Sequence, residues 1–290
     1  MTSAAAMAAR PARLARPAAW LLAFTVFFSA ALVFAVEPMA GKLFLPLIGG
    51  SAAVWNASLA FFQAALLAGY LYAHLLQRLS SLRTQVALHL GVLALAALAL
   101  PLRVTGLLGA PWPHAPLAWL VLAMALTLGA PFAALSATAP LAQAWLVRSA
   151  GPLAGGRDPY RLYAASNLGS LLALLAYPLL IEPLAGLRAQ TTGWSAAYLM
   201  FVATMLAVGA VCWRTAAAVQ APPPATGEVA WRERLAWVLL AAAPSSLLLG
   251  VTTHITADVA SAPLLWVIPL VIYLSTFVYA FGRGRGRSVA

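Results

Sequence analysis

The sequence predicts an all-α polytopic membrane protein, a bundle of about eight transmembrane helices. Three observations support this fold class: the composition, the lengths of the apolar segments and the distribution of basic residues. Of the 290 residues, 63% are hydrophobic and only 8% are charged, whereas soluble domains are about 45–50% apolar and about 25% charged. Such a chain has too few polar residues to cover a water-soluble globule, so we expect an integral membrane protein that contacts the lipid bilayer.

Eight segments are long and apolar enough to span a bilayer, which requires about 20 residues. The fourth contains Gly129, Pro131 and Pro140, so we expect a kink or a break within it. The predicted spans are 17–36, 54–76, 85–102, 117–147, 162–182, 193–213, 235–257 and 262–281.

The basic residues predict that both termini face the cytoplasm. With the N-terminus inside, fourteen of the 17 Lys and Arg residues lie in cytoplasmic segments. The outer side then holds only Lys42, Arg103 and Arg188, a strong positive-inside bias. The net charge of +11 is spread singly or in short groups between apolar runs, so we expect no nucleic-acid partner. The single Cys212 excludes an intrachain disulfide and a multi-cysteine metal site.

The chain divides into five parts. We expect the first apolar segment to be an uncleaved anchor rather than a signal peptide, because its apolar run is long. The triple proline after the sixth span is typical of a flexible linker. The parts are a basic N-terminal segment (1–16), a six-helix membrane domain (17–214), a Pro/Ala-rich cytoplasmic linker (215–234), two further spans (235–281) and a basic tail (282–290).

Two charged residues follow the first apolar segment. The stretch "VEPMAGK" holds Glu37 and the only lysine, Lys42. One interpretation is a salt bridge or an ion-coupling pair, because ionisable groups in membranes are costly and usually functional. The other is an interfacial corner, in which Pro38 ends the helix and Glu37 anchors the turn. A similar stretch, "IEPLAG", places Glu182 at the outer end of the fifth span, and a helix-exit corner accounts for both.

Two other spans carry polar residues. The fourth holds Gln143, and the seventh ends with His254 and Asp258. Residues four apart share a helix face, so the last two could form a proton relay, or they could simply be solvated at the outer helix end. Two ligands on one helix are too few for a metal site.

The second and fifth spans carry side-chain amides. We expect Asn56, Gln63 and Asn167 to act as interhelical hydrogen-bond partners or, alternatively, as substrate ligands. Small residues around Gly169 in the fifth span predict close approach of a neighbouring helix. Asp158 and the following proline can cap the start of this span.

Several long segments resemble the membrane half of bacterial fused major-facilitator/spermidine-synthase proteins. The resemblance implies a multi-helix membrane region joined to a cytoplasmic spermidine-synthase-like domain that binds an S-adenosylmethionine-type cofactor. This sequence contains no counterpart of that domain, so we expect no cofactor and no aminopropyl transfer. The segments are "EPMAGKLFLPLIGGSAAVWNASLAFFQAALLAGYLYAH", "PFAALSATAPLAQAW", "DPYRLYAASNLGSLLALLAYPLLIEPLAG" and "PSSLLLGVTTHITADVASAPLLWVIPL".

The resemblance also implies a partly major-facilitator-like architecture. Such transporters have two six-helix halves joined by a cytoplasmic linker and built from three-helix repeats. Here the linker follows the sixth span, and the polar or broken segments fall on the first, fourth and seventh. Eight spans are too few for a two-half cavity unless chains associate as a homo-oligomer or a partner supplies the rest. The loop "QRLSSLR" also lacks the Asp and Gly of the facilitator signature.

The sequence therefore leaves three functional hypotheses. The first is a transporter-like domain of a bacterial inner membrane for a small polar or cationic solute, with polyamines as one class. The second is a non-catalytic anchor or scaffold for a separately encoded spermidine-synthase-like transferase. An enzyme with Glu37 or the His254/Asp258 pair as acid or base ranks last, because nothing arranges these groups around a nucleophile or a metal.

Overall fold

The computed structural model describes residues 3–104, 106–150, 160–215, 229–255 and 267–282, and the regular secondary structure in these ranges is entirely helical. Seven of the described helices are long and apolar enough to cross a membrane. The predicted all-α polytopic bundle is confirmed, and the chain is a multi-pass integral membrane protein. The predicted eighth span is described only from residue 267, as the shorter apolar helix α11 (Val267–Gly282).

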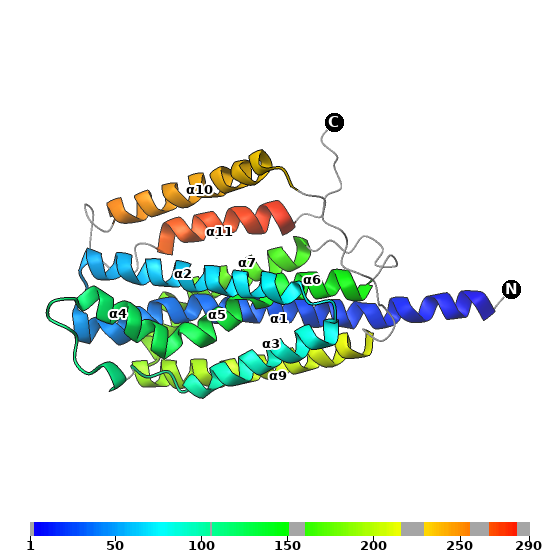
Figure 1. Ribbon diagram of the computed structural model, residues 1–290, viewed down its shortest axis with the longest axis horizontal. Helices are drawn as coiled ribbons and strands as arrows, with labels where there is room; N and C mark the ends of the chain where they lie inside the picture. Colours follow the sequence, from blue (N-terminus) through cyan, green and yellow to red (C-terminus); the bar gives the residue numbers. More distant parts are fainter. Residues whose placement is uncertain (1–2, 105, 151–159, 216–228, 256–266, 283–290) are drawn as a thin grey trace.

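Successive spans run in alternating directions, and α1 passes through the middle of the bundle (Figure 1). The first three spans are α1 (Ser3–Ile48), α2 (Ala52–Gln77) and α3 (Leu82–Ala96). The fourth comprises α4 (Pro116–Met124), the π-helical turn η3 (Ala125–Gly129), α5 (Ala130–Ser136) and α6 (Thr138–Ala150). The fifth comprises α7 (Tyr160–Ala176), the π-helical turn η4 (Tyr177–Ile181) and α8 (Glu182–Leu184), and the sixth is α9 (Leu187–Thr215).

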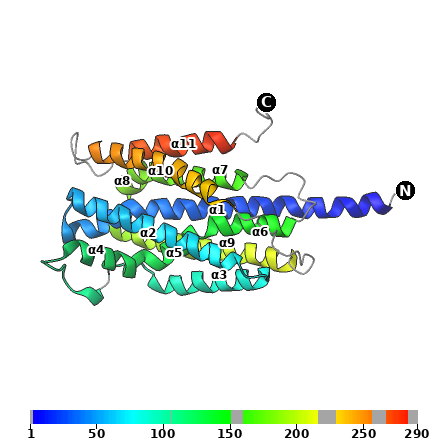
Figure 2. The same ribbon diagram turned by 45° about the horizontal axis from the view of Figure 1, so that its top comes forward.

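Helix α1 packs most extensively on α7, and it also contacts α9 and the fourth span. Helix α2 packs on the fourth span, while α3 packs on α9 and on α5. Figure 2, turned by 45°, shows α3 and α9 on the side of α1 opposite to α11. The largest fully buried side chains, Trp119, Trp145, Tyr177 and Tyr198, come from three of these spans and fill the interior.

The predicted end of the first helix is wrong. We expected a corner at Pro38, but α1 continues through it to Ile48. A proline in a helix interior removes one N–H donor. Membrane helices tolerate this loss because neighbouring helices and local adjustments compensate for it. Glu37 therefore does not sit at a corner but inside a continuous helix, about 16 Å before the end of α1 at Ile48, at 1.5 Å per residue. The second corner is real, because α8 ends at Leu184 and Ala185 is extended.

The predicted break in the fourth span is confirmed. Its helix widens to a π-turn over Ala125–Gly129 and is interrupted again at Ala137. Such single π-turns are frequently found at functional sites. The fifth span has a second π-turn, Tyr177–Ile181, directly before Glu182.

The predicted close approach on the fifth span is also confirmed. A Cβ added to Gly169 would overlap the backbone carbonyl of Phe27 in α1. On the other side of the bundle, Gly69 of α2 lies against α5, where a Cβ would come within 2.9 Å of Ser136 Cβ. In both places the absence of a side chain lets two helices touch backbone to backbone.

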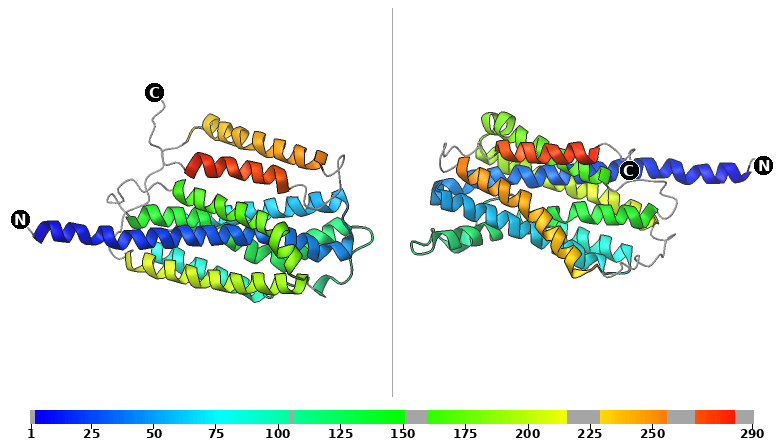
Figure 3. Two further views of the ribbon diagram at one scale, coloured as in Figure 1. Left: turned by 180° about the vertical axis from the view of Figure 1, so that it is seen from behind. Right: turned by 90° about the horizontal axis from the view of Figure 1, so that it is seen from above.

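Helix α10 (Trp231–His254) lies at the periphery. It contacts α11, which in turn packs on α7. Seen from above, α10 runs obliquely across this side of the bundle (Figure 3). None of the side chains in its span is buried, so its apolar surface faces lipid or another protein.

Candidate functional site

An ion pair joins the first and fifth spans near the outer end of the bundle. Lys42 Nζ on α1 contacts Glu182 Oε1 at the start of α8. Lys42 does not pair with Glu37, the neighbour we considered from sequence, but with the glutamate of the second Glu-Pro stretch. The side chains are 38% and 26% exposed. Pairing with Glu182 compensates the charge of an ammonium group carried on a membrane-spanning helix, where a lone charge is costly.

Hydrogen bonds of partly or fully buried side chains stabilise the corner that carries Glu182. Tyr177 donates its hydroxyl to Gln190 Oε1 at 2.8 Å, and Gln190 Nε2 donates to the carbonyl of Ala185 at 2.8 Å. These bonds connect η4, the extended residue after α8 and the first turns of α9. The second oxygen of Glu182 is buried without a hydrogen-bond partner in the described structure. The corner is thus held by hydrogen bonds, but only one of the two carboxylate oxygens of Glu182 has a partner.

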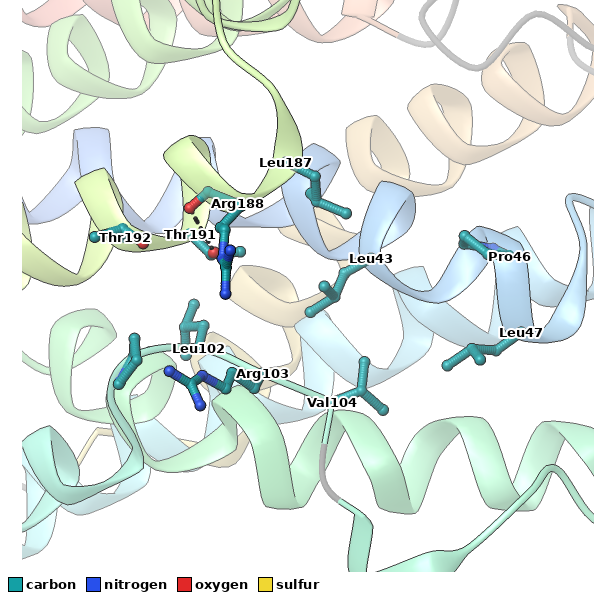
Figure 4. Close-up of a pocket in the computed structure, with 11 residues that line it drawn as sticks. Leu43, Pro46, Leu47, Leu102, Arg103, Val104, Leu187, Arg188, Thr191 and Thr192 are labelled. Carbon is teal, nitrogen blue, oxygen red and sulfur yellow. Dashed lines mark hydrogen bonds between the residues drawn. The ribbon is translucent and has the colours of Figure 1, made fainter.

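A pocket of about 560 Å³ is lined in part by Leu43, the residue that follows Lys42 on α1. The end of α1, the loop after η1 (Ala97–Ala99) and the start of α9 form its walls. Arg188 reaches into the gap from the start of α9, and Arg103 lies on the loop opposite (Figure 4). The remaining lining is mostly apolar: Leu43, Pro46, Leu47, Pro101, Leu102, Val104, Leu187, Thr191 and Thr192.

Glu37 is a second, separate feature of α1. The membrane span of this helix covers Ala18–Ile48, so Glu37 lies about 6 Å outward of its midpoint. Its side chain is half-buried, and no ion pair to another described residue involves it. The fourth span, which packs on α1, holds two buried polar atoms with no partner in the described structure, Trp119 Nε1 and Thr127 Oγ1. Unsatisfied polar groups inside a membrane protein are uncommon and often functional.

The other sequence-predicted residues do not gather around Glu37 or the pocket. Asn56 and Gln63 are exposed on α2, and Gln143 is half-buried on α6. None of these three lines either of the two pockets described in the structure. The interhelical hydrogen bonds predicted for Asn56 and Gln63 are not present among the described residues.

The remaining predictions concern the fifth and seventh spans. Asn167 is buried, but its amide donates to the carbonyl of Tyr163 one turn earlier in the same helix, at 2.8 Å, rather than to a neighbouring helix. His254 is exposed at the end of α10. Asp258, its proposed partner, and the predicted cap at Asp158 lie outside the described residues.

One polar cluster was missed by sequence reasoning. Gln85 and His89 of α3 are fully buried, and neither was among the candidate residues taken from the sequence. Gln85 donates to the carbonyl of Leu79 at 2.7 Å and accepts from Trp145 Nε1 at 3.0 Å. His89 Nδ1 lies 3.4 Å from the hydroxyl of Tyr72. The only sequence signal was the i, i+4 spacing of two polar residues on an apolar helix. The cluster ties α2, α3 and α6 together.

Comparisons with models of known protein families, with curated proteins and with solved structures found no match.

Proposed function

We propose that the protein is a transporter-like membrane domain in which Glu37 binds or couples a cationic solute or a proton. The observation that carries this proposal is the position of Glu37, a half-buried carboxylate inside the first span with no described ionic partner. A carboxylate in that environment is stabilised by binding a cation or a proton. A small polar or cationic solute fits this requirement, and polyamines belong to that chemical class.

The packing of the six spans supports a repeat architecture. Exchanging the first span with the fourth, the second with the fifth and the third with the sixth preserves the pattern of contacts. The contact of α1 with α7 corresponds to that of the fourth span with α2, and the contact of α1 with α9 to that of α5 with α3. Because each unit has three spans, the second is inverted in the membrane. Inverted repeats of this kind are common in secondary transporters, which bind solutes near the membrane midplane.

The ion pair fits the same architecture. Lys42 belongs to the first three-helix unit and Glu182 to the second, so the pair links the two units at their outer end. Such a link can close the outer side while Glu37 remains accessible from the other side. The sequence resemblance to the membrane half of fused major-facilitator/spermidine-synthase proteins agrees with this proposal and with a bacterial inner membrane.

Uptake by proteoliposomes tests the proposal. The purified chain is reconstituted, and uptake of labelled spermidine, putrescine and small monovalent cations is measured with and without a proton gradient. We expect Glu37→Gln to lower uptake at least tenfold, because the neutral amide cannot bind a cation or release a proton. Glu233→Gln is the matched control, since Glu233 is exposed at the cytoplasmic start of α10, and it should leave uptake unchanged. Equal uptake by wild type and Glu37→Gln contradicts the role of Glu37.

A second candidate function is a membrane anchor for a separately encoded spermidine-synthase-like protein. The observation that favours it is the length of α1, whose 46 residues correspond to about 69 Å of helix, roughly twice the thickness of a hydrocarbon core. The N-terminal part of α1 projects from the cytoplasmic end of the bundle (Figure 1). A soluble transferase encoded beside this gene that co-purifies with the full chain, but not with a chain lacking residues 1–16, would support this function.

A further inference from the structure

The outer end of the bundle concentrates positive charge where membrane topology disfavours it. Basic residues accumulate on the cytoplasmic side of membrane proteins, and in the predicted orientation only three lie outside. All three gather at one corner. Arg103 and Arg188 line the same pocket, and Lys42 directly precedes Leu43, which lines that pocket too. Topology alone does not explain this arrangement.

The three cations are not balanced by the described acidic groups. Lys42 is neutralised by Glu182. Neither Arg103 nor Arg188 has an ion pair within the described parts of the chain, so the pocket carries two uncompensated guanidinium groups. Arg188 also lies in the first turn of α9, where the helix dipole adds partial positive charge. An anion placed between the two groups would be attracted by both.

Hydrogen bonds in the walls of the pocket fix the backbone around the two arginines. The backbone N–H of Leu102 donates to Ser195 Oγ of α9 at 3.3 Å, and the Leu102 side chain is buried. These contacts fasten the loop that carries Arg103 directly onto the helix that carries Arg188. One turn along α9, the hydroxyl of Thr191 donates to the Arg188 carbonyl at 3.1 Å. The two backbone segments that carry the arginines are therefore fixed relative to each other, while both arginine side chains are exposed at the pocket.

We propose that this pocket binds a phosphate group at the outer surface of the membrane. Guanidinium groups form paired, charge-assisted hydrogen bonds with phosphate oxygens. Two arginines on opposite walls suit a tetrahedral group, which presents oxygens in more than one plane, and the exposed hydroxyl of Thr192 adds a further donor. The pocket volume of about 560 Å³ is much larger than a bare phosphate, and its leucine and proline walls accommodate an apolar portion of the same molecule.

The phosphate has two sources, a soluble phosphorylated compound or the headgroup of an anionic lipid, since the pocket lies at the ends of the spans. Two measurements distinguish them. In the first, the full chain in nanodiscs of pure phosphatidylcholine is titrated with sodium phosphate against sodium chloride of equal ionic strength. In the second, one third of the lipid is replaced by phosphatidylglycerol without added phosphate. Melting temperature is the readout in both, because a ligand that binds only the folded state stabilises it.

We expect the melting temperature to rise in at least one measurement. A rise with soluble phosphate assigns a soluble ligand, and a rise with phosphatidylglycerol alone assigns a lipid headgroup. In the Arg103→Gln/Arg188→Gln variant the apparent affinity should fall about tenfold to a hundredfold, as for lost hydrogen bonds to a charged group. Arg234→Gln is the matched control, because this arginine is exposed at the cytoplasmic start of α10, and it should behave as wild type.

The proposal is overturned if neither measurement raises the melting temperature of the wild-type chain, or if the double variant responds as wild type does. The Arg103→Lys/Arg188→Lys variant retains both charges and guards against a folding defect in the glutamine variant. Lysine lacks the planar fork of arginine, so the apparent affinity of the lysine variant for the phosphate group should fall by about threefold to tenfold. An unchanged affinity would contradict recognition by two guanidinium groups. This site shares no residue with the proposed role of Glu37, so either proposal can fail without the other.

Discussion

The crossing of α1 and α7 permits a sharp test, because α1 carries both Glu37 and Lys42. Gly169 of α7 faces the backbone of Phe27 in α1, and this is the most extensive helix–helix contact of the bundle. Gly169→Ala adds a single methyl group at that point. The methyl group would overlap the Phe27 carbonyl oxygen and lie 3.0 Å from its carbonyl carbon. Both atoms belong to backbone, so no side-chain rotation relieves the overlap.

The expected cost follows from the geometry. Two carbon atoms pack best at about 3.5–4.0 Å, so the two helices must separate by on the order of 1 Å. A gap of about 0.5–1 Å forfeits roughly a quarter to a half of the dispersion energy of each affected contact. Overpacking in well-packed cores typically costs about 1–3 kcal/mol, and the size of this interface places Gly169→Ala at the upper end, about 2–3 kcal/mol.

The assay is unfolding of the purified chain in detergent, followed by tryptophan fluorescence during heating or titration with sodium dodecyl sulfate. The matched control is Gly91→Ala in α3, where an added Cβ has no atom within 4 Å. Alanine is a better helix former than glycine by about 1 kcal/mol, so the control should be slightly more stable than wild type. If Gly169→Ala is as stable as Gly91→Ala, the two backbones do not touch and the reasoning is refuted.

Two further predictions concern polar contacts. Lys42→Met, Glu182→Gln and the double variant should reveal a coupling free energy of about 1–2 kcal/mol between the two side chains. Breaking a fully buried pair typically costs about 3–5 kcal/mol. We expect less here because both side chains are partly exposed. Changes in the free energy of unfolding that are additive within about 0.5 kcal/mol would show that the pair contributes nothing. Gln85→Leu should destabilise the bundle by about 1–3 kcal/mol, since it leaves the buried Trp145 indole N–H without its acceptor. Gln63→Leu on an exposed surface is the control, and equal melting temperatures for the two variants would argue against the buried network.

Much of the fold could be predicted from sequence because its signals are local. A run of about 20 apolar residues is sufficient to identify a spanning helix, and the observed spans agree with the predicted ones within a few residues except at two ends. The first span continues twelve residues past its predicted end, and the sixth begins six residues earlier, at Leu187. The break near Gly129 and the tight crossing at Gly169 were also predicted. The error at Pro38 arose because proline ends helices readily in water but less strictly inside a protein bundle in lipid.

The arrangement of the charged groups required the tertiary structure. Sequence identified Glu37, Lys42 and Glu182 as unusual, but hydropathy does not report which helices touch. Only packing brings Lys42 to Glu182, 140 positions away, and places Arg103 and Arg188 on one pocket. The sequence by itself determined that the chain spans the membrane, because transfer of apolar side chains from water is nearly additive along the chain. Contacts between distant helices decided where its few charges meet, because those contacts depend on backbone approach and side-chain shape that no single segment encodes.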